Sequence, residues 1–514
     1  MFPGSAWEHA ALEAPPPERA GGAGQGGKQD AYPTSLLPSK TAPGSATVGV
    51  MWQQLSSQKR CRIVGSAAAA LCDRSEELIQ ACSSDQRTDP VETITSELLP
   101  LCAAMRFLAK RGPKILAPRR VGIWRRPAWL IGVHSVVHRV PLGKVLVLGT
   151  WNYPLLLPGV QLAQALAAGN RVLLKPAVGA ESASTILVEC FHACGVPADQ
   201  LVLLDSDTSA AVGAIADGVD LIVLTGAAET GRKVLHGAAD TLSASIMELS
   251  GCDAVVVLPG VDERRLMDAL RFGLSFNGSA TCIAPRRLIL PRAEHDVILD
   301  RLQTTLADQP PVIVHPAARP SVADQIAKAF EAGAVDPLGR YCETRLRDEG
   351  TMYPLLLDRV AEDHEIASAD IFAPVLSVIC ADDTDHAIRL VNGCPYRLAA
   401  SVFGPHSAAA DVANQLNVGT VTINDLIAPT ADPRLPFGGR GQSGFGVTRG
   451  PEGLLAMTAA KVISRRRGPI APHLRPRSES DQQMLHGVLQ IMHAGGVRKR
   501  LAGLRRMVGG VKKT

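Results

Sequence analysis

Residues 144–176 read KVLVLGTWNYPLLLPGVQLAQALAAGNRVLLKP, and this stretch decides the fold class. Two short, wholly apolar runs, 145–148 and 172–174, flank a helical run over 155–168 that ends near Gly169 and Asn170. Apolar strands without alternation are typical of a parallel sheet that is covered on both faces. The stretch therefore predicts a strand–helix–strand unit of an α/β fold with a parallel sheet.

The same alternation of short apolar strands and helices continues along the chain. Up to about residue 257 it predicts helices at 181–194, 207–216 and 229–239 and strands at 201–204, 221–224, 245–249 and 254–258. A second set spans 262–426, with helices at 262–275, 294–307 and 321–332 and strands at 288–290, 375–379, 399–403 and 420–423. Ligands of such sheets bind at the carboxyl ends of strands, so the candidate site lies in the loops after residues 148, 174, 224 and 249.

The segments before the first strand have a different character. Residues 52–117 are expected to be mainly helical, and 128–140 to form β-structure. Residues 1–50 are rich in Pro, Gly, Ala and Ser, which predicts a disordered arm. The ordered pattern begins at Met51, which leads to the hypothesis that translation starts there.

Composition narrows the class of protein. The chain has 514 residues, of which 46% are hydrophobic and 20% charged, and a net charge of +4. This length predicts more than one domain, and so small a net charge does not favour nucleic-acid binding. No apolar run approaches the ~18 residues that span a bilayer, and the N-terminus has no secretory signal pattern. Eleven cysteines without a C-x-x-C pair favour a reducing, cytoplasmic location, and no metal site is expected.

Charge is distributed unevenly between the main body and the tail. Residues 464–514 carry twelve Arg and Lys against Glu479 and Asp481, a net charge of +10, so the rest of the chain carries −6. One interpretation is a solvated, partly disordered basic tail. The other is contact with an anionic surface such as lipid.

Three residues in candidate loops suggest catalytic chemistry. Cys282 follows the small residues 278–280, although a single Cys in such a loop is more often a buried structural thiol. Asn152 follows the strand 145–148 and is either an oxyanion donor or a turn-forming Asn. Glu248 lies inside an apolar strand, where burial raises a carboxyl pKa toward that of a general base, unless the Glu is a paired structural residue.

Other residues in these loops are suited to an anionic cofactor. Lys175 ends a strand and faces either ribose and phosphate groups or water. The segment from Thr225 to Gly231 opens a helix, whose N-terminus favours anions. Asp370 and Phe372 precede a strand and suit a ribose and a flat ring, or alternatively a helix cap and a core position.

Taken in order, these segments resemble the aldehyde dehydrogenase superfamily over residues 52–463. The W-N-Y-P motif at 151–154 and T-C-I-A-P at 281–285 are most similar to its class 3 branch of fatty and aromatic aldehyde dehydrogenases; the other matching segments are 175–176, 225–231, 248–249, 372–375 and 435–439. The resemblance implies two Rossmann-like parallel-sheet domains with a small β extension for oligomerisation, and a homodimer. It implies oxidation of a medium- or long-chain aliphatic or aromatic aldehyde to the acid with NAD or NADP.

The resemblance also implies domain borders. The NAD(P)-binding domain would comprise 51–127 and 141–250, and the catalytic domain 251–463. The oligomerisation strands would lie at 128–140 and 464–480, and the basic tail at 481–514, with membrane contact as a second use of the tail.

The matching positions carry the roles of the family. Cys282 is similar to the nucleophile that forms a thiohemiacetal and then a thioester, with the Asn152 side chain and the Cys282 N–H holding the oxyanion. Glu248 is similar to the base that activates the hydrolytic water. The implied cofactor-binding residues are Trp151, Lys175, Thr225, Gly226, Gly231, Asp370 and Phe372.

The chain departs from the family pattern around the cofactor. Asp370 stands where the family usually has Glu, and Val178 replaces a Glu that excludes the 2′-phosphate of NADP; Glu181 is a partial substitute. Further departures are Ser250, Cys252, Ser279, Ala280 and Ala373. Two alternatives remain at this point: an acyl-CoA-forming or acyl-reducing dehydrogenase of the same fold, which the retained Glu248 argues against, and a catalytically degenerate binding or scaffold protein.

Overall fold

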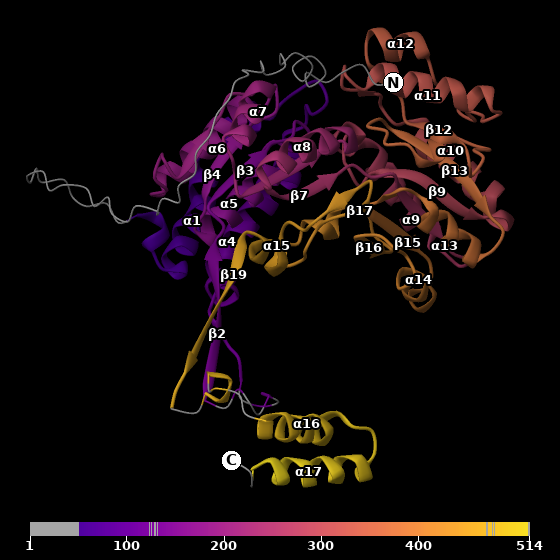
Figure 1. The fold of residues 1–514 in the computed structure, drawn as a ribbon. Coiled ribbons are helices and arrows are strands. Elements are labelled where there is room, and N and C mark those ends of the chain that lie inside the picture. Colours follow the sequence, from indigo (N-terminus) through magenta and orange to yellow (C-terminus); the bar gives the residue numbers. More distant parts are fainter. Residues whose placement is uncertain are drawn as a thin grey trace, which may run out of the picture. The chain divides into compact units, whose positions relative to one another are not determined.

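The computed structural model describes residues 51–511 apart from 123, 125, 128–129, 131, 469–470, 475 and 477–478. The predicted disordered arm, 1–50, lies outside the described residues. The chain divides into two units, the first built from 1–117 with 139–460 and the second from 118–138 with 461–514 (Figure 1).

The first unit contains the predicted parallel sheet. Its strand order is β18–β7–β6–β3–β4–β5, from β3 (Lys144–Leu148), β4 (Arg171–Lys175), β5 (Leu201–Leu203), β6 (Leu221–Gly226), β7 (Ala244–Leu249) and β18 (Gly444–Phe445). The five strands β3 to β7 pair in parallel, as expected from their apolar runs. The short β18 comes from the Gly-rich segment and pairs antiparallel with β7, so that Gly444 lies opposite Glu248.

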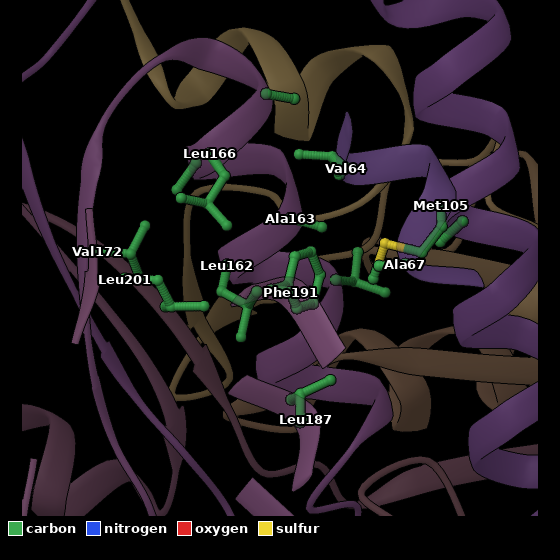
Figure 2. Close-up of a cluster of buried hydrophobic side chains, with 14 of the residues drawn as sticks. Val64, Ala67, Met105, Leu162, Ala163, Leu166, Val172, Leu187, Phe191 and Leu201 are labelled. Atoms are coloured by element: carbon green, nitrogen blue, oxygen red, sulfur yellow. The ribbon is translucent and has the colours of Figure 1, made fainter. Parts of the chain in front are cut away.

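Helices cover this sheet, and α5 (Leu156–Ala168) is buried along its whole length. Around it and along the sheet are α1 (Ser57–Asp73), α4 (Leu99–Ile115), α6 (Glu181–Ala193), α7 (Thr208–Ala216) and α8 (Ala228–Thr241). Figure 2 shows part of the resulting core, in which side chains from α1, α4, α5, α6, β4 and β5 meet: Val64, Ala67, Met105, Leu162, Ala163, Leu166, Val172, Leu187, Phe191 and Leu201. This packing holds α5 in place, and α5 begins directly after the loop that follows β3.

A second sheet of the same unit is wholly parallel. Its order is β12–β13–β9–β8–β15–β16, from β8 (Asp253–Val257), β9 (Pro285–Pro291), β12 (Leu355–Leu357), β13 (Val375–Ala381), β15 (Ala399–Phe403) and β16 (Thr420–Ile423). Its helices include α9 (Glu263–Ser275), α10 (His295–Ala307), α11 (Arg319–Glu331), α13 (Thr384–Gly393) and α14 (His406–Ala413). Only residues 250–252 separate β7 from β8, so the chain passes from one sheet to the other within three residues.

Short elements complete the first unit. They are α2 (Ser75–Ala81), α3 (Pro90–Thr93), α12 (Glu343–Asp348), α15 (Gly450–Ala456), β10 (Val312–Ile313), β11 (Thr351–Met352), β14 (Tyr396–Arg397) and β17 (Arg440–Gly441).

A small sheet in the order β1–β2–β19 belongs mainly to the second unit; it is formed by β1 (Arg119–Arg120), β2 (Val133–Pro141) and β19 (Thr458–Arg466). The predicted β-structure over 128–140 begins at Val133, and residues 128–129 and 131 lie outside the described part. The predicted strand over 464–480 is wrong beyond Arg466, because the next regular element, a 3₁₀ turn, is Pro472–Leu474. A Gly and three Pro at 468–476 explain this end of the strand.

The interpretation of the tail as partly disordered is also wrong for residues 479–511. They form two helices, α16 (Glu479–His493) and α17 (Val497–Val511), which pack against each other. The basic composition concealed a helical spacing of apolar residues in both segments. None of the helices in the described part of the chain has the length and apolar character needed to cross a bilayer.

Candidate active site

The loop that carries Cys282 has an unusual backbone. After α9 the chain passes through Asn277, Gly278 and Ser279, with φ values of 53°, 58° and 58°. This left-handed conformation is easy for Gly but strained for Ser, and such strain persists only where the surroundings enforce it. Cys282 follows in this loop, three residues before β9, and is partly exposed.

Arg286 enforces this backbone. Its guanidinium donates to Ser279 Oγ (2.8 Å), to the Ser279 carbonyl (2.6 Å) and to the Ala373 carbonyl (2.7 Å). Arg286 is buried, and burial lowers its pKa to about 10, so it remains a cation at neutral pH. It thus ties the Cys282 loop to the segment around Phe372.

The loop after β3 meets the Cys282 loop. Asn152 Nδ2 donates to the Ala280 carbonyl (2.7 Å), and Oδ1 accepts from Thr150 Oγ1 (2.6 Å). The Tyr153 hydroxyl shares a hydrogen bond of 2.5 Å with Thr281 Oγ1. An amide nitrogen carries two N–H groups, so the Asn152 amide retains one for a ligand oxygen while the other is bonded to Ala280, two residues before Cys282.

A buried ion pair holds both loops. Arg87 contacts Glu97 at 2.7 Å and also donates to Asn277 Oδ1 (2.9 Å) and the Asn152 carbonyl (2.5 Å). Glu97 Oε2 accepts from the backbone N–H groups of Leu155 (3.1 Å) and Leu156 (2.6 Å) at the start of α5. Both side chains of the pair are almost wholly buried, at 3% and 0% exposure. The sequence interpretation did not include this pair.

Glu248 lies near Cys282. It is buried on β7, Oε2 accepts from Thr448 Oγ1 (2.8 Å), and Oε1 has no partner among the described residues. Burial raises the pKa of Glu248, while Arg449, Thr448 and Gln161 oppose the rise. Burial and then the charges of Glu248 and Asp253 raise the pKa of Cys282 well above its usual range. The charge of Glu248 is therefore felt at the Cys282 thiol.

Arg449 adds a positive charge beside Glu248 and Cys282. It is buried, donates to the Thr430 carbonyl (2.7 Å) and lies 4.8 Å from the centroid of the Phe437 ring. Its charge favours the ionised forms of both Glu248 and Cys282. Arg449 also lines a mainly apolar pocket between α4, α5 and residues 431–449, together with Pro100, Ala104, Phe107, Leu108, Leu156, Val160, Gln164, Ala431 and Pro433.

The predicted cofactor residues of the first sheet lie at strand ends. Lys175 ends β4 and is half-buried; burial lowers its pKa, and Asp207 and Glu181 oppose this. Thr225 and Gly226 end β6 directly before α8, and Thr225 Oγ1 accepts from Gln161 (2.9 Å). A Cβ built on Gly226 meets only Leu224, at 3.6 Å, so its backbone is open to a ligand.

Gly231 has a different environment. It lies within α8, and a Cβ there would come within 2.9 Å of the Leu249 side chain. The glycine lets α8 approach the sheet closely, so its place in the structure is one of helix packing. Direct contact between Gly231 and the cofactor stays a prediction.

The remaining predicted residues form an aromatic group with a carboxyl nearby. Trp151 stacks on His315 with ring centroids 4.3 Å apart, and Phe372 lies 6.2 Å from Trp151. Burial raises the pKa of Asp370 to about 6, against a hydrogen bond from Ser250 and the charge of Arg286, and its Oδ1 is buried without a partner in the described chain. His315 was not predicted; its pKa is lowered by burial and by Arg319.

These residues fit a dinucleotide. An open Gly226 backbone before the N-terminus of α8 suits a pyrophosphate, a half-buried Lys175 suits a ribose, and the orphaned Oδ1 of Asp370 is an acceptor for a second ribose. Stacked rings offer a flat wall. Within the described part of the chain no group of three or more His, Cys, Asp or Glu is placed to hold a metal ion.

Comparison with known proteins agrees with the geometry. Residues 41–463 match the model of the aldehyde dehydrogenase family. A 4,4'-diapolycopene aldehyde oxidase of Methylomonas sp is 29% identical, with 87% of this chain and 86% of the relative covered. A probable coniferyl aldehyde dehydrogenase of Pseudomonas aeruginosa is 30% identical, with 76% and 82% covered.

A solved structure is similar as well. The aldehyde dehydrogenase of Mycobacterium tuberculosis complexed with NAD+ is 27% identical, has a TM-score of 0.73 and matches 80% of this chain and 86% of its own.

Proposed function

Since this chain belongs to the aldehyde dehydrogenase family and is an NAD(P)-dependent aldehyde dehydrogenase, we propose that Cys282 is its nucleophile, Glu248 its base and Asn152 its oxyanion donor. The observation that carries the proposal is that the segments of Asn152, Glu248 and Cys282 come together. Asn152 is bonded to the Cys282 loop, and the pKa of Cys282 responds to the charge of Glu248.

The chemistry follows from these positions. Cys282 releases its proton to solvent, with the charge of Arg449 favouring the thiolate. The thiolate then forms a C–S bond to the aldehyde carbon while Asn152 Nδ2 and the Cys282 N–H hold the oxyanion. A nicotinamide cofactor held at this site would supply the hydride acceptor, and loss of the hydride from the substrate carbon would leave Cys282 as a thioester. Glu248 then takes a proton from water, the hydroxide adds to the thioester carbon, and the C–S bond breaks to give the acid.

The family uses NAD or NADP, and the residues proposed to hold it are those at the strand ends. Lys175 would contact the adenosine ribose, and Thr225 and Gly226 the pyrophosphate. Trp151 and Phe372 would border the nicotinamide, with Asp370 at its ribose.

The substrate proposed is a medium- or long-chain aliphatic or an aromatic aldehyde, as in the class 3 branch. The apolar lining of the pocket next to Arg449 supports this, because apolar chains bind to such walls by desolvation. Two relatives are named for a diapolycopene aldehyde and for coniferyl aldehyde, both of which carry extended or aromatic carbon skeletons.

Glu248→Gln is expected to lower the steady-state rate by about 10²-fold or more while leaving a rapid burst of reduced cofactor, because the amide cannot activate water. In the native enzyme the acidic limb of the pH–rate profile lies above the ordinary carboxyl range, since burial raises the pKa of Glu248 and only the ionised form is a base. Stopped-flow absorbance and pH profiles measure both effects. A Glu248→Gln variant with native steady-state turnover would refute the assignment.

Glu181→Gln is expected to raise the ratio of kcat/KM for NADP to that for NAD by about tenfold. Against the effect of burial, hydrogen bonds from Ser206 and the backbone hold the pKa of Glu181 below its usual value, so its charge stands beside Lys175. That charge would repel a 2′-phosphate. Initial rates with both cofactors test the change, with exposed Asp217→Asn as the matched control; an unaltered ratio would remove Glu181 from cofactor selection.

The oligomeric state, the domain borders and the location of the enzyme are also proposed. We propose a homodimer, with β2 and β19 as contact strands, and the predicted borders at 250/251 and 463/464 as domain borders. All eleven cysteines are free thiols, which supports a cytoplasmic location. The basic tail supports peripheral contact with a membrane.

A further inference from the structure

The helical hairpin of α16 and α17 pairs through its glycines. A Cβ built on Gly487 would lie 2.5 Å from the Met507 nitrogen and 2.6 Å from the Gly503 carbonyl oxygen. A Cβ on Gly503 would lie 2.6 Å from Gln490 Cβ and 2.9 Å from the Ile491 nitrogen. The two backbones therefore touch, and the larger apolar side chains of the hairpin are not needed to join its helices.

Those apolar side chains are instead exposed in a regular pattern. On α16 they recur at positions 485, 489 and 492, and on α17 at 501, 504 and 508, the i, i+3, i+4, i+7 spacing of one helix face. Their exposed fractions run from 39% to 60%. We call this set the hairpin face: Leu485, Leu489, Met492, Leu501, Leu504 and Val508.

The two stripes lie on the same side of the hairpin. Met492 follows the packed Ile491, and Leu504 follows the packed Gly503. Each residue of an α-helix is rotated about the helix axis by about 100° from the residue before it, always in the same sense from the N-terminus to the C-terminus. Because α17 returns antiparallel to α16 after the link 494–496, the two rotations carry both stripes to one side. Leu485 and Leu489 lie two positions from Gly487, about 200° around α16. The apolar surface is therefore convex and extends from the side of Met492 and Leu504 to the outer side of α16.

Basic residues border this face. Arg498 and Arg505 of α17 flank its stripe and are exposed, and residues 479–514 hold seven Lys and Arg against Glu479 and Asp481. An apolar face flanked by cations is the pattern of a helix that lies in the interface of an anionic bilayer.

We propose that the hairpin face docks into the surface of a bilayer that contains anionic phospholipid. The inference rests on the proposed membrane contact of the tail and names its surface and its lipid class. A polyanion such as nucleic acid would pair with the cations but would leave the apolar stripes in water. A second copy of the hairpin would bring two such basic rims together, at a cost in repulsion.

The test uses the full chain and vesicles of phosphatidylcholine, alone or mixed in equal parts with phosphatidylglycerol. The native chain is expected to co-sediment with the mixed vesicles at low salt and at least about tenfold less with the neutral ones. The variant Leu489→Gln/Leu501→Gln/Leu504→Gln is expected to bind the mixed vesicles at least about tenfold more weakly. Because these side chains are exposed, the helix content measured by circular dichroism should not change.

Two further variants sharpen the result. Val91→Gln/Val212→Gln/Val297→Gln removes three exposed apolar side chains of the first unit and should bind as the native chain does. Arg498→Gln/Lys499→Gln/Arg505→Gln should reduce the preference for phosphatidylglycerol and weaken the dependence on salt.

Three outcomes would overturn the proposal. The first is that the native chain does not bind the mixed vesicles. The second is that the Leu variant binds them as tightly as the native chain does. The third is that the native chain binds no vesicles while the Leu variant has a different oligomeric state in sedimentation, which would assign the face to a second copy. Activity toward a soluble aromatic aldehyde, measured on the same samples, separates a failure of docking from a failure of the proposed catalytic function, because docking does not require Cys282.

Discussion

Cys282→Ala is expected to lower the aldehyde-dependent reduction of the cofactor by at least about 10⁴-fold, because it removes the group that bonds to the substrate carbon. Cofactor binding should persist, since the proposed contacts lie on Lys175, Thr225 and the aromatic group. Absorbance of the reduced cofactor measures the rate, and quenching of Trp fluorescence measures binding. The combination of lost turnover and retained binding distinguishes a missing nucleophile from a collapsed site.

The matched control is Cys72→Ala. This thiol is exposed on α1 and should be silent in both assays. If Cys282→Ala kept activity within tenfold of the native enzyme, the nucleophile would have to be another group, and the proposed mechanism would fail.

Arg87→Met is expected to lower the free energy of unfolding by about 3–5 kcal/mol, because it leaves the Glu97 carboxylate buried without its partner. It also removes the donors to Asn277 and the Asn152 carbonyl, so turnover should fall even under conditions where the variant is folded. Urea unfolding followed by fluorescence, and kcat of the folded variant, measure the two effects.

Two comparisons separate this expectation from a general loss of charge. The double variant Arg87→Met/Glu97→Gln should recover part of the lost stability, because no unpaired charge remains in the interior. The exposed ion pair of Arg292 with Asp382 provides a surface control, and Arg292→Met should leave the unfolding midpoint almost unchanged. Equal losses from Arg87→Met and Arg292→Met would contradict a bracing role for the buried pair.

The strands of both sheets were predictable because they are short, apolar on both faces and bounded by turns. The loops after β3, β4, β6 and β7 followed from strand ends alone, and in the structure Asn152 and Glu248 do lie near Cys282. The carboxyl ends of parallel strands lie at one edge of the sheet, so residues that follow different strands come close together in space. That rule reaches Asn152, Lys175 and Thr225 without any knowledge of side-chain contacts. It does not reach Cys282, Asp370 or Phe372, which lie before β9 and β13.

The residues that were missed share a different property. Arg87 binds Asn277 across 190 positions, and Arg286 acts through carbonyl groups on two other segments. Each is a buried charge that is stabilised by partners elsewhere in the chain, and the local spacing of apolar residues does not reveal such partners. The available signal was weaker: a Glu97 within an apolar run, and two Arg at the start of an apolar strand.

The complete burial of α5 has a consequence for synthesis of the chain on the ribosome. Gln164 of this helix donates to the Gly450 carbonyl, 286 residues later. At about 5–20 residues per second, translation reaches that partner on the order of 15–60 s after α5 emerges. During this time a helix that is buried on every side in the folded protein has no complete cover. The nascent chain therefore exposes this core helix for that interval, before it can act as an enzyme.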